Sequence, residues 1–253
     1  MLRRALTATT IFGVLVTVGH AGAGAATCPP DAVRVGTTCV DKYEAGIWVV
    51  PPRNRNLVKK ILDGNATLAE LQAAGATQIG LYGPSGITES DAFPPDGQWT
   101  PAPGSNPPSP GVYAVSLQGA PPSLASWYQA QQACALAGKR LLDNEEWERA
   151  AAGTPDPGPS GTPTAQGCNH FFDWPPYPAG SRSQCVSAWG AYDMVGNFGE
   201  WVADWVFPSP DTYDPAADPA IHPIIDGIAG LRRPEPRYFA EDVSDGIGFR
   251  CGR

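Results

Sequence analysis

The sequence contains few of the residues on which most metalloenzymes and redox enzymes depend. It has three histidines, His20, His170 and His222, and its six cysteines include no C-x-x-C pair. A zinc ribbon and a thioredoxin-like redox motif are therefore absent. No G-x-S-x-G, P-loop or H-E-x-x-H motif is present either, so nothing in the sequence supports the enzyme classes that these motifs define.

Positive charge is also scarce. The chain has 17 Lys and Arg against 25 Asp and Glu, a formal net charge of −8. Phosphate binding needs clustered cations, so the chain is a poor candidate for binding nucleic acid or an anionic membrane. The one locally basic stretch, RNRNLVKK at 53–60, is adequately explained as a solvated surface.

Residues 1–26 are typical of a secretory signal peptide. Arg3 and Arg4 precede the apolar stretch TIFGVLVTV, and the small-residue run AGAGAA leads to a cleavage site near Ala26. The apolar stretch is too short to span a bilayer, and no other transmembrane segment is predicted. We therefore expect an exported protein, whether periplasmic, cell-surface or extracellular. A lipid anchor on Cys28 is the alternative, although Thr27 is unusual before such a site.

All six cysteines lie beyond the signal. An even number of cysteines in an oxidising compartment favours three disulfides over metal ligation. Gly and Pro make up more than a fifth of the chain, which predicts many turns and short regular elements. The remaining length suits one sizeable core, so a single domain is expected over residues 27–253. The cysteines are Cys28, Cys39, Cys134, Cys168, Cys185 and Cys251.

Local patterns predict short elements separated by loops. Alternating apolar residues on both sides of Gly36 predict a hairpin, with Cys28 and Cys39 close enough in sequence to staple it. Asp143 followed by Glu146 predicts a capping box at the start of a helix. Residues 82–123, rich in Pro, Gly, Ser and Asp, are interpreted as a long surface insertion. The other expected elements are one or two helices over 56–75, a helix over 123–138 that stops at Gly138, and extended segments over 139–142, 199–207 and 246–253.

Four stretches, in this order along the chain, resemble one known family. They are CVDKYEAG (39–46), AGKRLLDNEEWERAA (137–151), WGAYDMVGNFGEWVADW (189–205) and IGFRC (247–251). Together they are similar to the signatures of the formylglycine-generating enzyme (sulfatase-modifying factor) family. The resemblance implies a single α+β domain of low regularity with a C-type-lectin-like fold. It also implies a bridge between Cys134 and Cys251, which leaves Cys28–Cys39 and Cys168–Cys185 as the expected remaining disulfides.

The resemblance further implies a structural calcium site in the loop that follows Tyr192. The family's ligand positions correspond here to the side chains of Asp193 and Glu200 and to the main-chain oxygens of Gly196 and Phe198. Calcium prefers such a mixture of carboxylate and carbonyl oxygens. The alternative is that Asp193 and Glu200 cap local amides. A second family calcium site would have Asn169 as its nearest candidate, although an asparagine in a turn explains that residue as well.

The enzymes of the family oxidise a substrate cysteine with O₂ and copper, using two cysteines placed between the loop and the closing strand. The interval 201–250 contains no cysteine, so neither a copper dithiolate nor a mixed disulfide can form there, and copper is not expected. A related branch uses three histidines to bind iron. His20 lies in the predicted signal, which excludes that site. His170 and His222 are interpreted as isolated loop residues.

These observations favour an exported, calcium-stabilised, non-catalytic binding or scaffold module, monomeric, with a protein, peptide or glycan ligand. The alternative is an active metal-dependent oxidase of the formylglycine-generating type with a rearranged centre. A purely structural envelope protein is a third hypothesis. Family membership alone does not assign the family's reaction.

Overall fold

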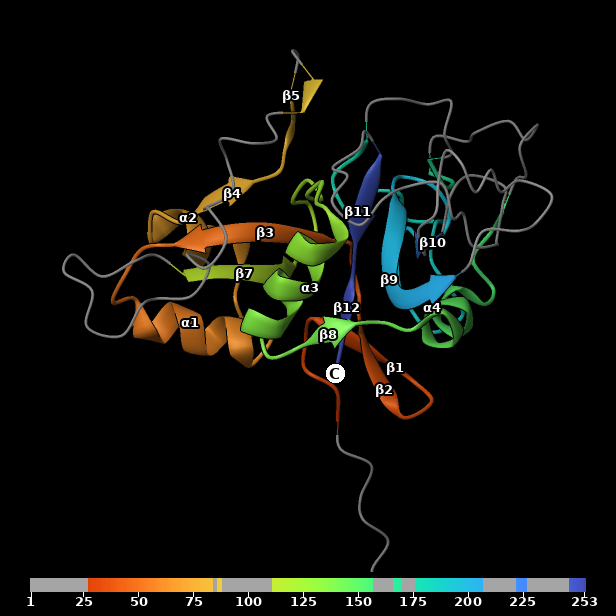
Figure 1. The fold of residues 1–253 in the computed structure, drawn as a ribbon, viewed down its shortest axis with the longest axis horizontal. Coiled ribbons are helices and arrows are strands. Elements are labelled where there is room, and N and C mark those ends of the chain that lie inside the picture. The colour runs from red at the N-terminus through yellow and green to blue at the C-terminus, as the bar shows by residue number, and fades with distance from the viewer. Residues whose placement is uncertain are drawn as a thin grey trace, which may run out of the picture.

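A computed structural model describes residues 27–83, 86–87, 111–156, 166–169, 176–206, 222–226 and 246–253 (Figure 1). The four helices in this part of the chain are α1 (Arg55–Leu62), α2 (Leu68–Ala73), α3 (Trp127–Leu136) and α4 (Asn144–Ala151). The strands are β1 (Ala32–Val35), β2 (Thr38–Asp41), β3 (Ala45–Val50), β4 (Thr77–Ile79), β5 (Tyr82–Gly83), β6 (Gly86–Ile87), β7 (Gly111–Ser116), β8 (Arg140–Leu141), β9 (Gly199–Val206), β10 (His222–Asp226), β11 (Ile247–Phe249) and β12 (Cys251–Gly252). Within these residues, no helix is long and apolar enough to cross a membrane.

Side-chain caps set where the helices begin. The Asp143 carboxylate accepts from the amide of Glu146 at 2.7 Å, and the Glu146 side chain bonds back to the Asp143 amide, which confirms the predicted capping box. Reciprocal pairs of the same kind start α2 and α3. Gly138, at φ +68°, ends α3 in the left-handed conformation that glycine adopts without strain.

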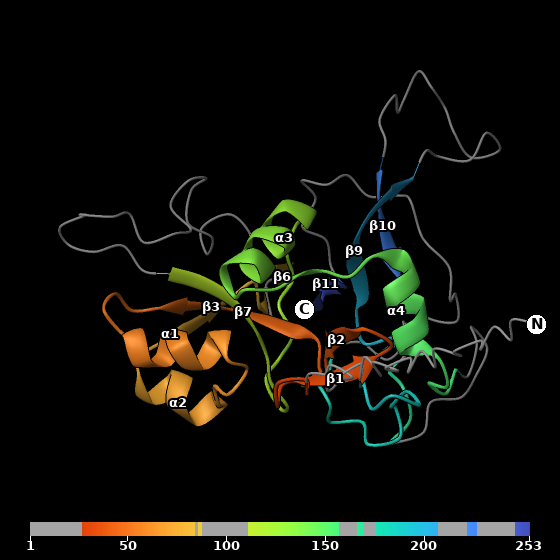
Figure 2. The same cartoon turned by 90° about the horizontal axis from the view of Figure 1, so that it is seen from below.

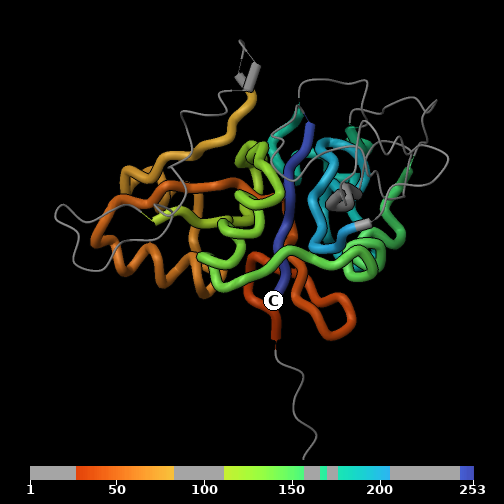
Figure 3. The backbone as a smooth tube through the Cα atoms, viewed as in Figure 1, coloured from red at the N-terminus to blue at the C-terminus, as the bar shows by residue number. Residues whose placement is uncertain are grey.

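The two ends of the described chain meet in one sheet. The predicted hairpin of β1 and β2 forms, and the four-stranded sheet has the order β1-β2-β12-β8. Gly252 of β12 pairs with Val40 of β2, and Cys251 pairs with Leu141 of β8. Figure 3 shows the closing segment running beside the opening hairpin through the middle of the molecule. The last strand therefore joins the first and central parts of the chain.

A second sheet, β4-β3-β7, carries the larger core. Helix α3 lies on one side of it, with α1 and α2 on the other (Figure 2). All six residues of β7 are buried and pair antiparallel with β3. The insertion expected over about 82–123 was therefore too long, because 111–116 is a buried strand of this sheet. Its GVYAVS sequence is buried throughout and has no apolar–polar alternation.

The third sheet, β10-β9-β11, pairs β9 antiparallel with β10 and parallel with β11. His222 begins β10, so its assignment to a loop was wrong; His170 lies outside the described residues. A smaller core, centred on Trp147, Met194 and Val202, packs α4 against β1, β2 and β9. The loop that carries the predicted site lies beside this core.

All six cysteines are paired, as expected. Cys28–Cys39 staples the first hairpin, and Cys168–Cys185 joins two loop segments. Cys134 of α3 binds Cys251 of β12 across 117 residues of sequence. Three disulfides indicate an oxidising, extracytoplasmic location, because such bonds form and persist there.

Candidate functional site

The loop after Tyr192 turns tightly. Three of its residues have positive φ values: Asp193 at 57°, Gly196 at 72° and Asn197 at 62°. Glycine adopts this conformation freely, and Asp and Asn tolerate it better than other residues. The loop is also buried, with Asp193 only 3% exposed. The sequence DMVGN therefore forms a packed turn rather than a solvated loop.

Asp193 caps a neighbouring segment. Its Oδ2 accepts a hydrogen bond from the main-chain amide of Gly180 at 2.6 Å. Burial raises the pKa of Asp193 to about 6, an effect that this hydrogen bond and the Arg250 charge oppose. The contact is the amide capping that the sequence left open as the alternative to calcium ligation.

Glu200 forms a buried ion pair with Arg250. The Glu200 Oε2 lies 2.7 Å from Arg250 Nε, and Oε1 lies 2.6 Å from Nη2. Trp147 Nε1 donates a further hydrogen bond to Oε2 at 2.6 Å. Both charged side chains have 0% exposure. Such a fork-to-carboxylate arrangement is the strongest geometry for this kind of pair.

The Arg250 guanidinium also ties the closing segment to two others. It donates to the main-chain oxygens of Asp41 at 3.2 Å and Tyr192 at 2.8 Å. One side chain thus joins the opening hairpin, the turn and strand β9. The GFRC stretch that pointed to the family contains this arginine, but its buried role did not follow from the sequence.

Glu44 is a third buried carboxylate at the turn and was missed by the sequence analysis. It is 1% exposed, and its Oε1 accepts from the Phe198 amide at 3.1 Å, while Oε2 accepts from the Asn197 side chain. Burial raises the pKa of Glu44 well above its ordinary value, and the charges of Asp193 and Glu200 add to the effect. An acid within the otherwise apolar run EAGIWVV was the available signal.

The predicted calcium ligands lie on this turn and at the start of β9, but they are not equally available. Asp193 and Gly196 belong to the turn and Phe198 follows it. They offer a carboxylate and main-chain carbonyl groups, the kinds of ligand that calcium prefers. Glu200 fits less well, since both of its oxygens face Arg250 and one also accepts from Trp147. In the described part of the chain, no group of three or more His, Cys, Asp or Glu side chains is arranged to hold a metal ion. Calcium binding by this turn stays a prediction.

Asn169 lies against the same turn. Its main-chain oxygen accepts from the Asn197 amide at 2.5 Å, and its Nδ2 donates to Asn197 Oδ1 at 3.2 Å. Its Oδ1 is buried and has no hydrogen-bond partner within the described residues. The residue therefore anchors the turn, and a second calcium site here also stays a prediction.

An exposed cluster of rings, the aromatic patch, lies apart from this buried centre. It consists of Trp127, Tyr128 and Trp205. Trp127 contacts Tyr128 edge-on, with 5.4 Å between centroids, and Trp205 in the same way at 5.0 Å. Trp127 is largely buried and donates from Nε1 to the Val202 oxygen at 2.8 Å. Tyr128 is 55% exposed and Trp205 40% exposed, so these two rings are not core residues.

Comparison with known proteins now assigns the family. The model of the sulfatase-modifying factor enzyme 1-like domain matches residues 64–251, most of the chain. The chain therefore belongs to the formylglycine-generating enzyme (sulfatase-modifying factor) family, and the predicted α+β fold of that type is confirmed.

The chain is similar to the I1 and U1 variants of the Major Tropism Determinant, each 14% identical, with TM-scores of 0.46 and 0.48. Each match covers 88% of this chain and 52% of the other, so the chain spans about half the length of these structures. A search of curated proteins found no match.

Proposed function

We propose that this chain is an exported, non-catalytic member of its family that binds a protein, peptide or glycan ligand. The observation that carries the proposal is the state of the cysteines. All six are closed in disulfides, and none is free. Cysteine oxidation by a thiolate-bound copper needs thiolates, and exchange with a substrate thiol needs an accessible disulfide or thiol.

Two of the three disulfides are buried in the fold, whereas Cys28 and Cys39 are only partly buried. Cys134 and Cys251 are both 0% exposed and lie within the larger core. Cys168 and Cys185 form a small buried cluster with Val195, directly behind the turn. A bridge in such surroundings is protected from an attacking thiol, because exchange requires access to a sulfur atom. These four cysteines support stability rather than catalysis, and the Cys28–Cys39 bridge staples the first hairpin.

The aromatic patch is the surface best suited to a ligand. Trp and Tyr are enriched at the energetic centres of interfaces, where rigid rings bury large areas at low entropic cost. Here Tyr128 and Trp205 are held by edge-to-face contact with Trp127, which is itself anchored to β9. The same kind of ring surface serves for peptides and for sugars.

Binding to glycan and peptide arrays tests the proposal, with the mature protein as probe. We expect a specific ligand whose binding is lost in Trp205→Ala and in Tyr128→Ala. Trp189→Ala is the matched control, since Trp189 is 43% exposed and lies outside the patch. Equal loss in the control, or no loss in either patch variant, would exclude the patch as the binding surface.

A parallel assay tests whether the protein lacks the cysteine-oxidising activity of its family. The mature protein, supplied with copper and O₂, is incubated with a cysteine-containing peptide, and the peptide is analysed by mass spectrometry. Thiol titration of the unfolded, unreduced protein is measured alongside. We expect no aldehyde product and no free thiol. Formation of formylglycine would overturn the proposal in favour of an oxidase with a rearranged centre.

A further inference from the structure

Helix α1 borders a pocket that the proposed function does not use. The pocket has a volume of about 470 Å³ and lies between α1, the end of β3 and the start of β7. This volume is within the range of small-molecule sites, about 300–1,000 Å³. The RNRNLVKK stretch was expected to be a solvated surface, but three of its four cations line this pocket.

The walls of the pocket are largely apolar. Leu62 is 42% exposed, an unusual position for a large aliphatic side chain, and the Tyr113 ring lies over Gly111. A Cβ at Gly111 would come within 2.5 Å of the Tyr113 hydroxyl oxygen, so glycine is what leaves room for the ring. The apolar lining consists of Val50, Pro51, Pro52, Val58, Leu62 and Tyr113.

The charges around this apolar surface are mostly positive. Arg53, Arg55 and Lys59 line the pocket, and Asp63 is its one acid among the described residues. Asp63 is already paired with Lys59. Neither arginine side chain has an ion-pair or hydrogen-bond partner within the described part of the chain. Two guanidinium groups that no described residue compensates therefore face solvent, on a chain with a net charge of −8.

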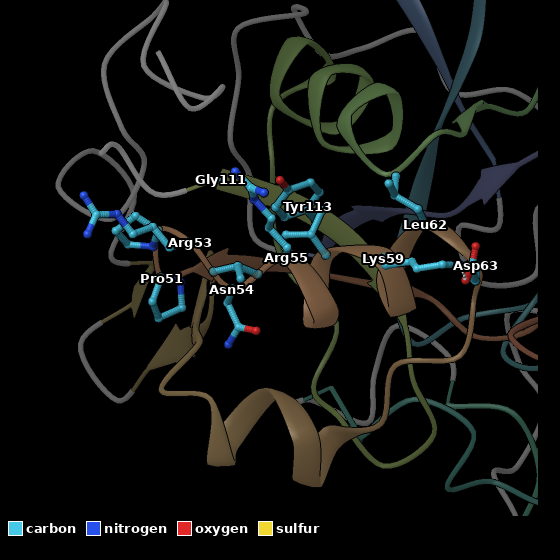
Figure 4. A pocket seen from close by; sticks show the side chains of 12 residues that line it. Pro51, Arg53, Asn54, Arg55, Lys59, Leu62, Asp63, Gly111 and Tyr113 are labelled. Atoms are coloured by element: carbon cyan, nitrogen blue, oxygen red, sulfur yellow. Dashed lines mark hydrogen bonds and ion pairs between the residues drawn. The ribbon is translucent and has the colours of Figure 1, made fainter. Parts of the chain in front are cut away.

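Figure 4 shows how these groups lie. The Arg55 side chain extends beside Tyr113 and Gly111, whereas Lys59, Leu62 and Asp63 lie at the opposite end of the pocket. Arg53 lies at the outer edge and points away from Tyr113. A molecule that contacts Tyr113 and Leu62 would therefore have Arg55 as its neighbouring cation. Arg53 would add to the local positive potential.

We propose that this pocket binds an amphipathic organic anion, a carboxylate attached to an apolar or aromatic body. The guanidinium of Arg55 would bind the carboxylate in the two-pronged geometry that arginine favours. The body would cover Val58, Leu62 and the edge of Tyr113. An inorganic anion would leave the apolar wall unused, and a neutral apolar molecule would leave the arginine unpaired.

Two-dimensional amide NMR of the mature protein tests this, with 4-phenylbutyrate as the probe. We expect saturable shifts confined to α1 and to the start of β7. Acetate, which lacks the body, and 4-phenylbutyramide, which lacks the charge, should each bind at least about tenfold more weakly. The dipeptide N-acetyl-Leu-Phe, which has a free carboxylate, distinguishes a small organic acid from a peptide as the source of the anion. Tighter binding of the dipeptide than of 4-phenylbutyrate would indicate a peptide carboxyl terminus.

Matched substitutions separate the pocket from general charge. Arg55→Gln should weaken 4-phenylbutyrate at least about tenfold without affecting the fold, because its side chain is exposed and unpaired. Lys60→Gln is the control: it removes the same charge from the same helix, but Lys60 lies outside the pocket and pairs with Glu70. Equal binding of the amide, equal weakening by the control, or shifts spread over other surfaces would each overturn the proposal.

Discussion

Replacing Glu200 by glutamine tests whether the Arg250 pair holds the buried centre. Glutamine keeps the shape of the side chain but removes its charge and replaces one acceptor oxygen by an NH₂ donor. The guanidinium therefore stays buried without its carboxylate partner, and only neutral oxygens, those of the new amide and of the Asp41 and Tyr192 carbonyls, accept from it. Both partners are 0% exposed, so water does not compensate the loss. Removing one member of a buried pair costs about 3–5 kcal/mol.

The expected effect is large enough for an ordinary thermal melt. For a domain of about 150–250 residues, 1 kcal/mol corresponds to about 2–4 °C. Glu200→Gln should therefore lower the Tm by about 6–20 °C. Arg140→Gln is the control, because it breaks an ion pair with Glu146 in which the Arg140 side chain is 52% exposed. The loss of such a pair should lower the free energy of unfolding by less than about 1 kcal/mol.

Each melt is recorded with calcium and with a chelator, which separates the two roles of Glu200. The Arg250 pair predicts that Glu200→Gln lowers the Tm in both conditions. Calcium ligation predicts that chelation lowers the Tm of the unmodified protein and that Glu200→Gln abolishes this sensitivity. A loss below about 1 kcal/mol in the chelator would refute the reasoning from the buried pair.

Two further predictions concern the sheet that joins the chain ends. Replacing Cys134 and Cys251 together by serine should lower the free energy of unfolding by about 4.9 kcal/mol, and replacing Cys28 and Cys39 together should lower it by about 2.8 kcal/mol. The difference arises because the loss of chain entropy grows with loop length, and the two disulfides close loops of 117 and 11 residues. Similar losses for the two double variants in urea melts would contradict this prediction. Burial raises the pKa of Asp41 from 3.8 to about 6, so its stabilising contribution is fully present below pH 3.8 and is lost as pH rises through about 6. Asp41 alone should thus lower stability by up to about 3 kcal/mol between pH 4 and 7.5. Asp193 and Glu44, whose pKa values burial also raises, should add to the fall in the same range. Asp41→Asn should therefore make the profile less steep without flattening it, and an unchanged slope would rule the prediction out.

Local elements were predictable because their signals are local. Asp143 and Glu146 lie one helical turn apart, and Gly138 marks the end of its helix by a conformation that only glycine adopts freely. The hairpin around Gly36 formed for the same reason. Such signals depend on a few neighbouring residues and are little affected by the rest of the fold.

Strand β7 was missed because its context masks it. Gly111–Ser116 follows a long segment rich in Pro and Gly, and its residues are buried on both faces. A strand of this kind has no period-two pattern, and only its pairing with β3 defines it. The wrong extent of the insertion therefore came from relying on composition where tertiary contacts decide the structure.

The candidate site was predicted as a turn but not as a network. The motif placed Asp193, Gly196 and Glu200 together, as the structure does. Their partners lie far away in sequence: Glu44 is 154 residues from Phe198, and Arg250 is 50 residues from Glu200. No spacing rule connects such residues, so one sequence could supply Asp193 and Glu200 but neither Glu44 nor the arginine that compensates their charge.

Comparing the same Glu-to-Gln replacement at positions 44 and 200 tests whether the ion pair with Arg250 stabilises the buried centre. Glu44→Gln makes the same isosteric replacement in the same buried region as Glu200→Gln, but Glu44 accepts only from the uncharged Phe198 amide and the Asn197 side chain. Losing one neutral hydrogen bond costs about 1 kcal/mol, and relief from the neighbouring carboxylates offsets part of it. We therefore expect Glu44→Gln to lower stability by no more than about 1 kcal/mol in urea melts with chelator, against about 3–5 kcal/mol for Glu200→Gln. Equal losses would mean that packing of the turn, rather than the Arg250 pair, stabilises the centre.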